Sequence, residues 1–125
     1  MSAPLTGRRV LIVEDESLVA MLLETILEDM GCTPIGPAAS IDEGLAMVAD
    51  GDNLDAALLD VNLAGRLVFP VAEALKARGV PFVFSTGYGE GGLPDEWRGQ
   101  ATIQKPFTEA TVRDALFKAM GVEQA

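Results

Sequence analysis

Three groups of charged residues stand evenly spaced along the chain, and their types suggest a common chemistry: Glu14-Asp15, Asp60 and Lys105-Pro106. Each group follows a run of mostly apolar residues. Carboxylates that lie close together repel one another unless a cation neutralises them or one takes a proton. Mg²⁺ suits such a cluster, because it binds one or two carboxylates together with waters and a phosphate oxygen. The residues therefore predict a Mg²⁺ and phosphoryl site.

An aspartate in such a cluster can attack phosphorus and form an acyl phosphate, provided that the charge on the phosphoryl oxygens is balanced. Mg²⁺ and the Lys105 ammonium would supply that balance. Thr86 could add a hydrogen bond to one phosphoryl oxygen, and Gly87 leaves the adjoining backbone free for close approach. These residues can work together only if the fold brings them to one place.

The order of apolar runs predicts the elements that position these groups. Five strands are expected, at residues 9–13, 33–37, 54–59, 80–85 and 101–104. Four helices are expected between and after them, at 17–30, 40–51, 67–78 and 108–120. Ser40 with Glu43 forms a capping-box pattern, and Thr108 is the expected cap of the last helix. The glycine-rich stretch 87–99 predicts a loop with at most a short helix near its Asp-Glu-Trp sequence.

Helical spacing also predicts which side chains of the first helix are buried. The expected apolar stripe consists of Leu18, Met21, Leu22, Leu23, Ile26 and Leu27. Alternating strands and helices indicate an α/β fold with a doubly wound, five-stranded parallel sheet in three layers. In such sheets ligands bind outside the carboxyl ends of the strands. The three charged groups and Thr86 all stand at or just past those ends.

Length and composition limit the alternatives. The 125 residues suit one domain, and 49% hydrophobic content argues against general disorder. A net charge of −10 argues against a nucleic-acid surface, and the absence of histidine excludes a Ser-His-Asp triad. No apolar run approaches the length of a membrane span, and residues 1–7 do not resemble a secretory signal. We therefore expect a cytoplasmic protein with no nucleic-acid or membrane partner.

Together, Glu14-Asp15, Asp60, Thr86 and Lys105-Pro106 resemble the signature of the receiver domain of two-component response regulators. The resemblance covers residues 8–122, with short tails at 1–7 and 123–125 and no expected output domain. It implies a flavodoxin-like (CheY-like) fold and a phosphoacceptor that assists its own phosphorylation and dephosphorylation without being an enzyme. Its expected partners are a sensor histidine kinase or histidine phosphotransfer protein, together with a downstream protein, and its role is that of shuttle, sink or stress-response relay.

The same resemblance implies a role for each site residue. Asp60 would accept the phosphoryl group from a phosphohistidine, with Thr86 and Lys105 assisting. Asp15 and Asp60 would bind Mg²⁺ directly. The main-chain carbonyl of Asn62 would be a third protein ligand, and Glu14 would act through water.

The chain departs from the common receiver pattern in its switch residues. Receivers usually carry an aromatic residue three positions before the lysine, where this chain has Thr102. Residues 84–89 are similar to the Phe-Ala-Thr-Gly-x-Tyr motif of an atypical subfamily that often stands alone. Tyr88 and Trp97 are therefore the expected aromatic members of a switch or partner surface, together with Thr86 and Thr102.

Other interpretations of the same residues stay open at this point. Glu14-Asp15 could simply favour the start of a helix, and Lys105 could be a solvated loop residue. The whole chain could be a binding module that works without phosphorylation through the surface from Tyr88 to Trp97. A phosphate-ester hydrolase of the haloacid dehalogenase type is disfavoured, because Asn62 stands where that family has a second aspartate.

Overall fold

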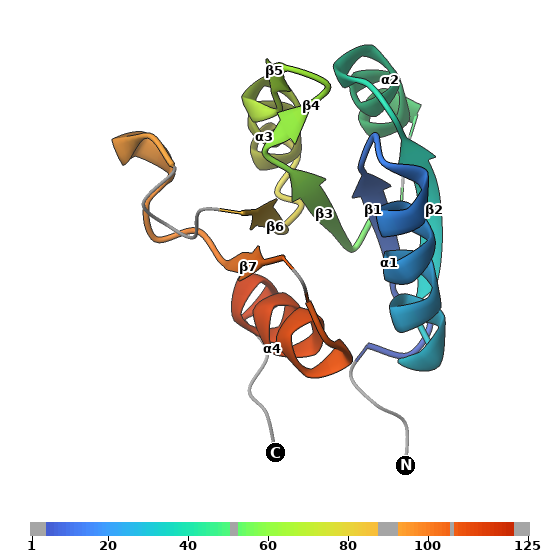
Figure 1. The fold of residues 1–125 in the computed structure, drawn as a ribbon. Coiled ribbons are helices and arrows are strands. Elements are labelled where there is room, and N and C mark those ends of the chain that lie inside the picture. Colours follow the sequence, from blue (N-terminus) through green and yellow to red (C-terminus); the bar gives the residue numbers. More distant parts are fainter. Residues whose placement is uncertain (1–4, 51–52, 88–92, 106, 122–125) are drawn as a thin grey trace.

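The computed structural model describes residues 5–50, 53–87, 93–105 and 107–121. Five parallel strands form one sheet in the order β2-β1-β3-β6-β7 (Figure 1). The strands are β1 Arg9–Val13, β2 Thr33–Ala38, β3 Ala56–Asp60, β6 Phe82–Thr86 and β7 Thr102–Gln104. The described helices are α1 Ser17–Asp29, α2 Ile41–Asp50, α3 Phe69–Ala77 and α4 Glu109–Met120, with a 3₁₀ turn, η2, at Asp95–Trp97. The predicted five-stranded α/β fold is confirmed.

Helices cover both faces of the sheet and give the three predicted layers (Figure 1). Alternate strand residues point to opposite faces. In β1, Val10 and Ile12 pack with α1 and α4, whereas Leu11 and Val13 pack with α2 and α3. Because both faces are covered, β3 and β6 are buried along their whole length. Strands of this kind hold the residues at their carboxyl ends in fixed positions.

The helix starts follow the predicted capping residues. The Oγ atom of Ser40 accepts a hydrogen bond from the Glu43 N–H, and the Glu43 carboxylate accepts one from the Ala39 N–H. Thr108 caps α4 by accepting a hydrogen bond from the Thr111 N–H at 3.2 Å. Side-chain oxygens at these positions satisfy N–H groups that have no partner inside the helix.

The predicted helix at 67–78 is wrong at its start. A two-stranded antiparallel hairpin, β4 Asn62–Leu63 and β5 Arg66–Leu67, comes first, and α3 begins only at Phe69. Ala64 and Gly65 form its two-residue turn with φ values of 50° and 90°. Positive φ at both turn residues matches the right-handed twist of a hairpin, although alanine adopts it at a cost.

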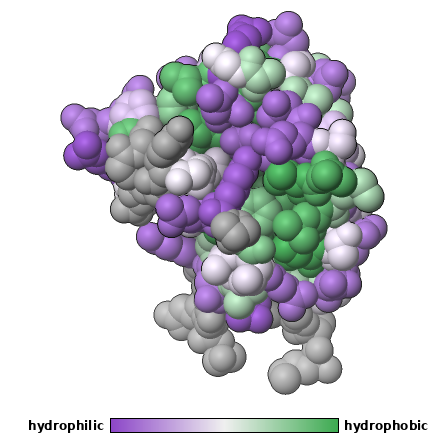
Figure 2. All heavy atoms as spheres, in the orientation of Figure 1, coloured by the Kyte–Doolittle hydropathy of each residue, from purple (hydrophilic) through white to green (hydrophobic). Residues whose placement is uncertain are grey.

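The predicted buried stripe of α1 is also wrong for three of its six residues. Leu23, Ile26 and Leu27 are buried, but Leu18, Met21 and Leu22 are 80%, 59% and 44% exposed. These three residues are here called the α1 patch. Figure 2 shows an apolar area over the position of α1. None of the described helices is long and apolar enough to span a membrane.

Candidate metal centre and phosphoryl-acceptor site

The sheet brings the predicted charged residues together at one edge. Glu14 and Asp15 follow β1, Asp60 ends β3, Thr86 ends β6, and Lys105 follows β7. Parallel strands point their carboxyl ends the same way, so residues far apart in the sequence meet there. The carboxylates of Glu14, Asp15 and Asp60 each place an oxygen within 4.8 Å of the others.

Glu14 is the deepest member of this cluster, with 2% of its surface exposed. Its backbone N–H donates to the Ala38 carbonyl of β2, and its Oε2 accepts a hydrogen bond from the Glu16 N–H at 3.1 Å. Burial disfavours the charged form, and the nearby Asp60 adds to this effect. Together they raise the pKa of Glu14 from 4.5 to about 7.

Lys105 supplies positive charge to the two buried carboxylates. Its Nζ lies 3.3 Å from Asp60 Oδ2 and 3.5 Å from Glu14 Oε1. Burial opposes the charge of Lys105, but Asp60 and Glu14 outweigh that effect and raise its pKa. The ammonium therefore stays charged at neutral pH and is positioned beside Asp60.

The loops around Asp60 form an open pocket of about 370 Å³. Asp60 accepts a hydrogen bond from the Asn62 N–H, and the Asn62 side chain in turn accepts one from the Gly65 N–H. Asp15, Asp60, Asn62, Gly87 and Lys105 are among the residues that line the pocket. A phosphoryl group bound to Asp60 would therefore be open to solvent and would lie close to the Lys105 ammonium.

The donor set fits Mg²⁺, which prefers oxygen ligands from carboxylates, carbonyls and water. Among the described residues, Oε1 of Glu14 is buried without a hydrogen-bond donor, although Lys105 lies nearby. Three clustered carboxylates face a single ammonium, which leaves an excess of negative charge at the site. A divalent cation would remove that excess. The Asn62 carbonyl as a ligand, and Glu14 acting through water, stay predictions.

The raised pKa of Glu14 predicts a pH-dependent stability in metal-free protein. Between about pH 4.5 and pH 7, folded Glu14 keeps a proton that the unfolded chain has released. The free energy of unfolding should therefore fall as pH rises through this window, by about 2–3 kcal/mol in total. Urea unfolding with EDTA at about pH 5 and about pH 8 measures the change.

A Glu14→Gln variant should lose this part of the pH dependence, since glutamine does not titrate. Glu28→Gln, which changes an exposed residue of α1, should retain it. Mg²⁺ added at about pH 8 should offset the loss in the wild type. If the free energy of unfolding fell equally with pH in the wild type and in Glu14→Gln, Glu14 would not be the cause of the pH dependence.

The predicted switch residues occupy different environments. Thr86 is 5% exposed at the end of β6, and its carbonyl accepts a hydrogen bond from the Lys105 N–H. Thr102 is half-buried in β7. Trp97 is only 3% exposed, so its side chain does not itself offer a partner surface, contrary to expectation. Tyr88 and Pro106 lie outside the described residues.

Sequence reasoning did not find the apolar surface beside the site. A second pocket, of about 370 Å³, is lined by Val19, Leu22, Phe107 and Lys105, which also lines the pocket around Asp60. Leu22 also belongs to the α1 patch, so this apolar surface continues to the edge of the charged site. The only signal in the sequence was that α1 has more apolar residues than one buried face needs.

Comparison with known proteins identifies the family. Residues 10–117 match the response regulator receiver domain. The chain is 34% identical over 119 residues to the phyllosphere-induced regulator PhyR of Methylorubrum extorquens, a match that covers 93% of this chain and 45% of that protein. The chain thus spans less than half the length of this relative.

Solved structures agree with this match. The solution structure of SdrG from Sphingomonas melonis Fr1 is 46% identical, with a TM-score of 0.82 over 91% of this chain and 97% of SdrG. The BeF3-activated conformation of SdrG, recorded from Pseudomonas melonis Fr1, is 46% identical with a TM-score of 0.78, over 92% of this chain and 98% of that one. With its carboxylate cluster, lysine and sheet order, the chain belongs to the response regulator receiver domain family.

Proposed function

We propose that Asp60 accepts a phosphoryl group from a phosphohistidine of a partner protein in a Mg²⁺-dependent transfer. The observation that carries this proposal is the position of the Lys105 Nζ, 3.3 Å from Asp60 Oδ2 and 3.5 Å from Glu14 Oε1. Receivers are not classical enzymes, and assistance by this chain to its own phosphorylation is part of the proposal. So is its predicted cytoplasmic location.

The transfer exchanges one bond for another. A carboxylate oxygen of Asp60 forms a bond to phosphorus while the phosphorus–nitrogen bond of the donor breaks. The electron pair of that bond stays on the imidazole nitrogen, which then takes a proton. Lys105 balances the charge on the phosphoryl oxygens, and Thr86 donates a hydrogen bond to one of them. Asp15, Asp60 and the Asn62 carbonyl would hold Mg²⁺, and the cation would supply charge stabilisation to the same oxygens.

The α1 patch is the proposed docking surface for the phosphohistidine protein. Leu18, Met21 and Leu22 follow the spacing of one helix face and lie beside the pocket that includes Lys105. Apolar anchors at this spacing suit a helix of the partner. A donor docked there would bring its phosphohistidine to the adjacent acceptor site.

Intact mass spectrometry with an acyl-phosphate donor tests the transfer chemistry. We expect a gain of one phosphoryl group in the presence of Mg²⁺ and none with EDTA, because three carboxylates would then repel the incoming group. The structure of a relative in a BeF3-activated conformation supports this expectation. Labelling that is equal with and without Mg²⁺ would contradict the metal-dependent mechanism.

A further inference from the structure

Trp97 is the centre of a four-ring aromatic cluster on the sheet face covered by α2 and α3. Its ring stacks on Phe69 at 5.9 Å between centroids and meets Phe82 and Phe84 edge to face at 5.8 and 5.7 Å. The Lys76 ammonium lies 5.7 Å from the indole centroid. The three-residue turn η2 is too short to be stable alone, so these contacts hold it in place.

Strand register places Trp97 near the position that lacks the usual aromatic residue. Phe84 of β6 pairs with Thr102 of β7, so their side chains share one sheet face. Trp97 packs against Phe84 on that same face. The indole therefore places an aromatic ring beside β6, on the sheet face where Thr102 has no ring to offer.

Two rings of the cluster stand close in sequence to the phosphoryl-acceptor site. Phe84 lies two residues before Thr86 on β6, so the two side chains point to the same face. Phe69 begins α3 directly after the hairpin that follows Asp60. Phe69 and Phe84 contact each other as well as Trp97. A change in the distance between Thr86 and the loop after Asp60 would therefore shift Phe84 and Phe69 relative to the indole.

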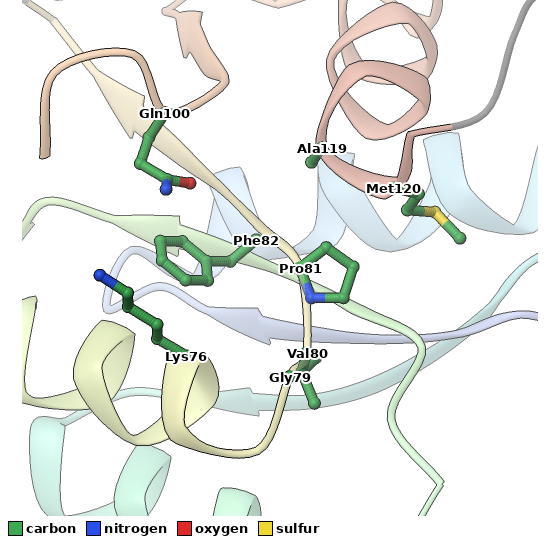
Figure 3. A pocket seen from close by; sticks show the side chains of 8 residues that line it. All are labelled: Lys76, Gly79, Val80, Pro81, Phe82, Gln100, Ala119 and Met120. Carbon is green, nitrogen blue, oxygen red and sulfur yellow. The ribbon is translucent and has the colours of Figure 1, made fainter.

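The surroundings of Trp97 include one unsatisfied polar atom and a nearby pocket. Within the described part of the chain, its buried Nε1 has no hydrogen-bond acceptor, which weakens this position. An open pocket of about 380 Å³ lies beside the cluster and is lined in part by Phe82, Lys76 and Gln100 (Figure 3). Lys76 and Phe82 line this pocket and also contact the indole.

We propose that Trp97 is the aromatic switch residue of this receiver and couples Thr86 to the segment 93–99. When the Thr86 hydroxyl turns toward a phosphoryl group on Asp60, the packing over Phe84 changes and the indole shifts. Segment 93–99 moves with it, because Leu93 and Trp97 are its buried anchors. This inference rests on the proposed phosphoryl transfer to Asp60.

Intrinsic fluorescence tests the proposal directly, since Trp97 is the single tryptophan of the chain. Beryllofluoride with Mg²⁺ serves as the phosphoryl mimic, and fluorine NMR measures the fraction bound. We expect the emission maximum to shift, and acrylamide quenching to change, in proportion to that fraction. Bound beryllofluoride with unchanged emission would overturn the inference and leave the proposed function intact. Failure to bind beryllofluoride would overturn both.

Three variants separate coupling from simple packing. Thr86→Val removes the hydroxyl and keeps a similar side-chain volume. We therefore expect that this variant, with beryllofluoride bound, keeps the emission maximum that it has without beryllofluoride. Phe69→Leu, at a half-buried position, should diminish the shift without preventing binding. Lys76→Met removes the cation over the indole and should alter the starting spectrum but keep the shift. A full shift in Thr86→Val would overturn the proposed coupling.

Discussion

Asp60→Asn should abolish phosphoryl labelling by both a phosphohistidine partner and a small acyl-phosphate donor. Asparagine keeps the shape of the side chain and can still accept the hydrogen bond from the Asn62 N–H. It lacks the carboxylate nucleophile, so no acyl phosphate can form. Intact mass spectrometry and radiolabel transfer would measure the loss. Asp29→Asn, an exposed change at the end of α1, should be labelled as the wild type.

The same substitution should stabilise the metal-free protein. Glu14 and Asp60 share one ammonium, and the charge of Asp60 helps to raise the pKa of Glu14. Asparagine removes that repulsion while Glu14 keeps its ion pair with Lys105, so we expect a gain of about 1 kcal/mol at neutral pH. Loss of labelling together with unfolding would not count as support. If Asp60→Asn were labelled to the same extent as the wild type, another residue would have to be the acceptor.

The sequence was sufficient to predict that Glu14, Asp60 and Lys105 meet, because parallel strands impose a simple rule. Once the apolar runs ending before Glu14, Asp60 and Lys105 are assigned as strands, their carboxyl ends must share an edge. The structure places these three residues in contact there. The depth of Glu14 could not be predicted in this way. It depends on local packing, in which the Glu14 N–H donates to the Ala38 carbonyl of β2 and the Glu14 carboxylate accepts a hydrogen bond from the Glu16 N–H.

Helical spacing predicts which residues share a face, but not what covers that face. Leu18 and Leu22 lie one turn apart and were expected in the core, yet the core contacts of α1 come from the other side of the helix. The turn at Ala64-Gly65 was missed for a different reason. The usual hairpin signal is Asn-Gly or Asp-Gly, and alanine at positive φ gives no such signal.

The relation between Trp97 and Thr102 also required the structure. The two residues are near in sequence, but only the pairing of Thr102 with Phe84 shows that both face the same side of the sheet. A sequence pattern records that an aromatic residue is missing at 102. It does not record that another ring packs beside the same strand. Packing between side chains of different elements is therefore the feature of this site that a sequence pattern predicts least well.

Leu18→Glu should reduce phosphoryl transfer from a phosphohistidine partner by about ten-fold to a hundred-fold. Burying an exposed leucine in an interface contributes about 1.5–3 kcal/mol, and a buried carboxylate without a partner would add to the loss. The folded protein should lose less than about 0.5 kcal/mol, because Leu18 is 80% exposed. Initial rates of transfer from a phosphorylated sensor kinase that labels the wild type would measure the effect.

The small acyl-phosphate donor separates docking from chemistry in this variant. It needs no protein surface, so Leu18→Glu should be labelled by it at the wild-type rate. Ala110→Glu adds the same charge at an exposed position of α4 and should leave both rates unchanged. If the labelling rate fell equally with both donors, the substitution in α1 would act through the geometry of the site around Asp15 and Asp60. A fall with the kinase alone requires that Leu18 contacts the partner, because the acceptor chemistry is then intact.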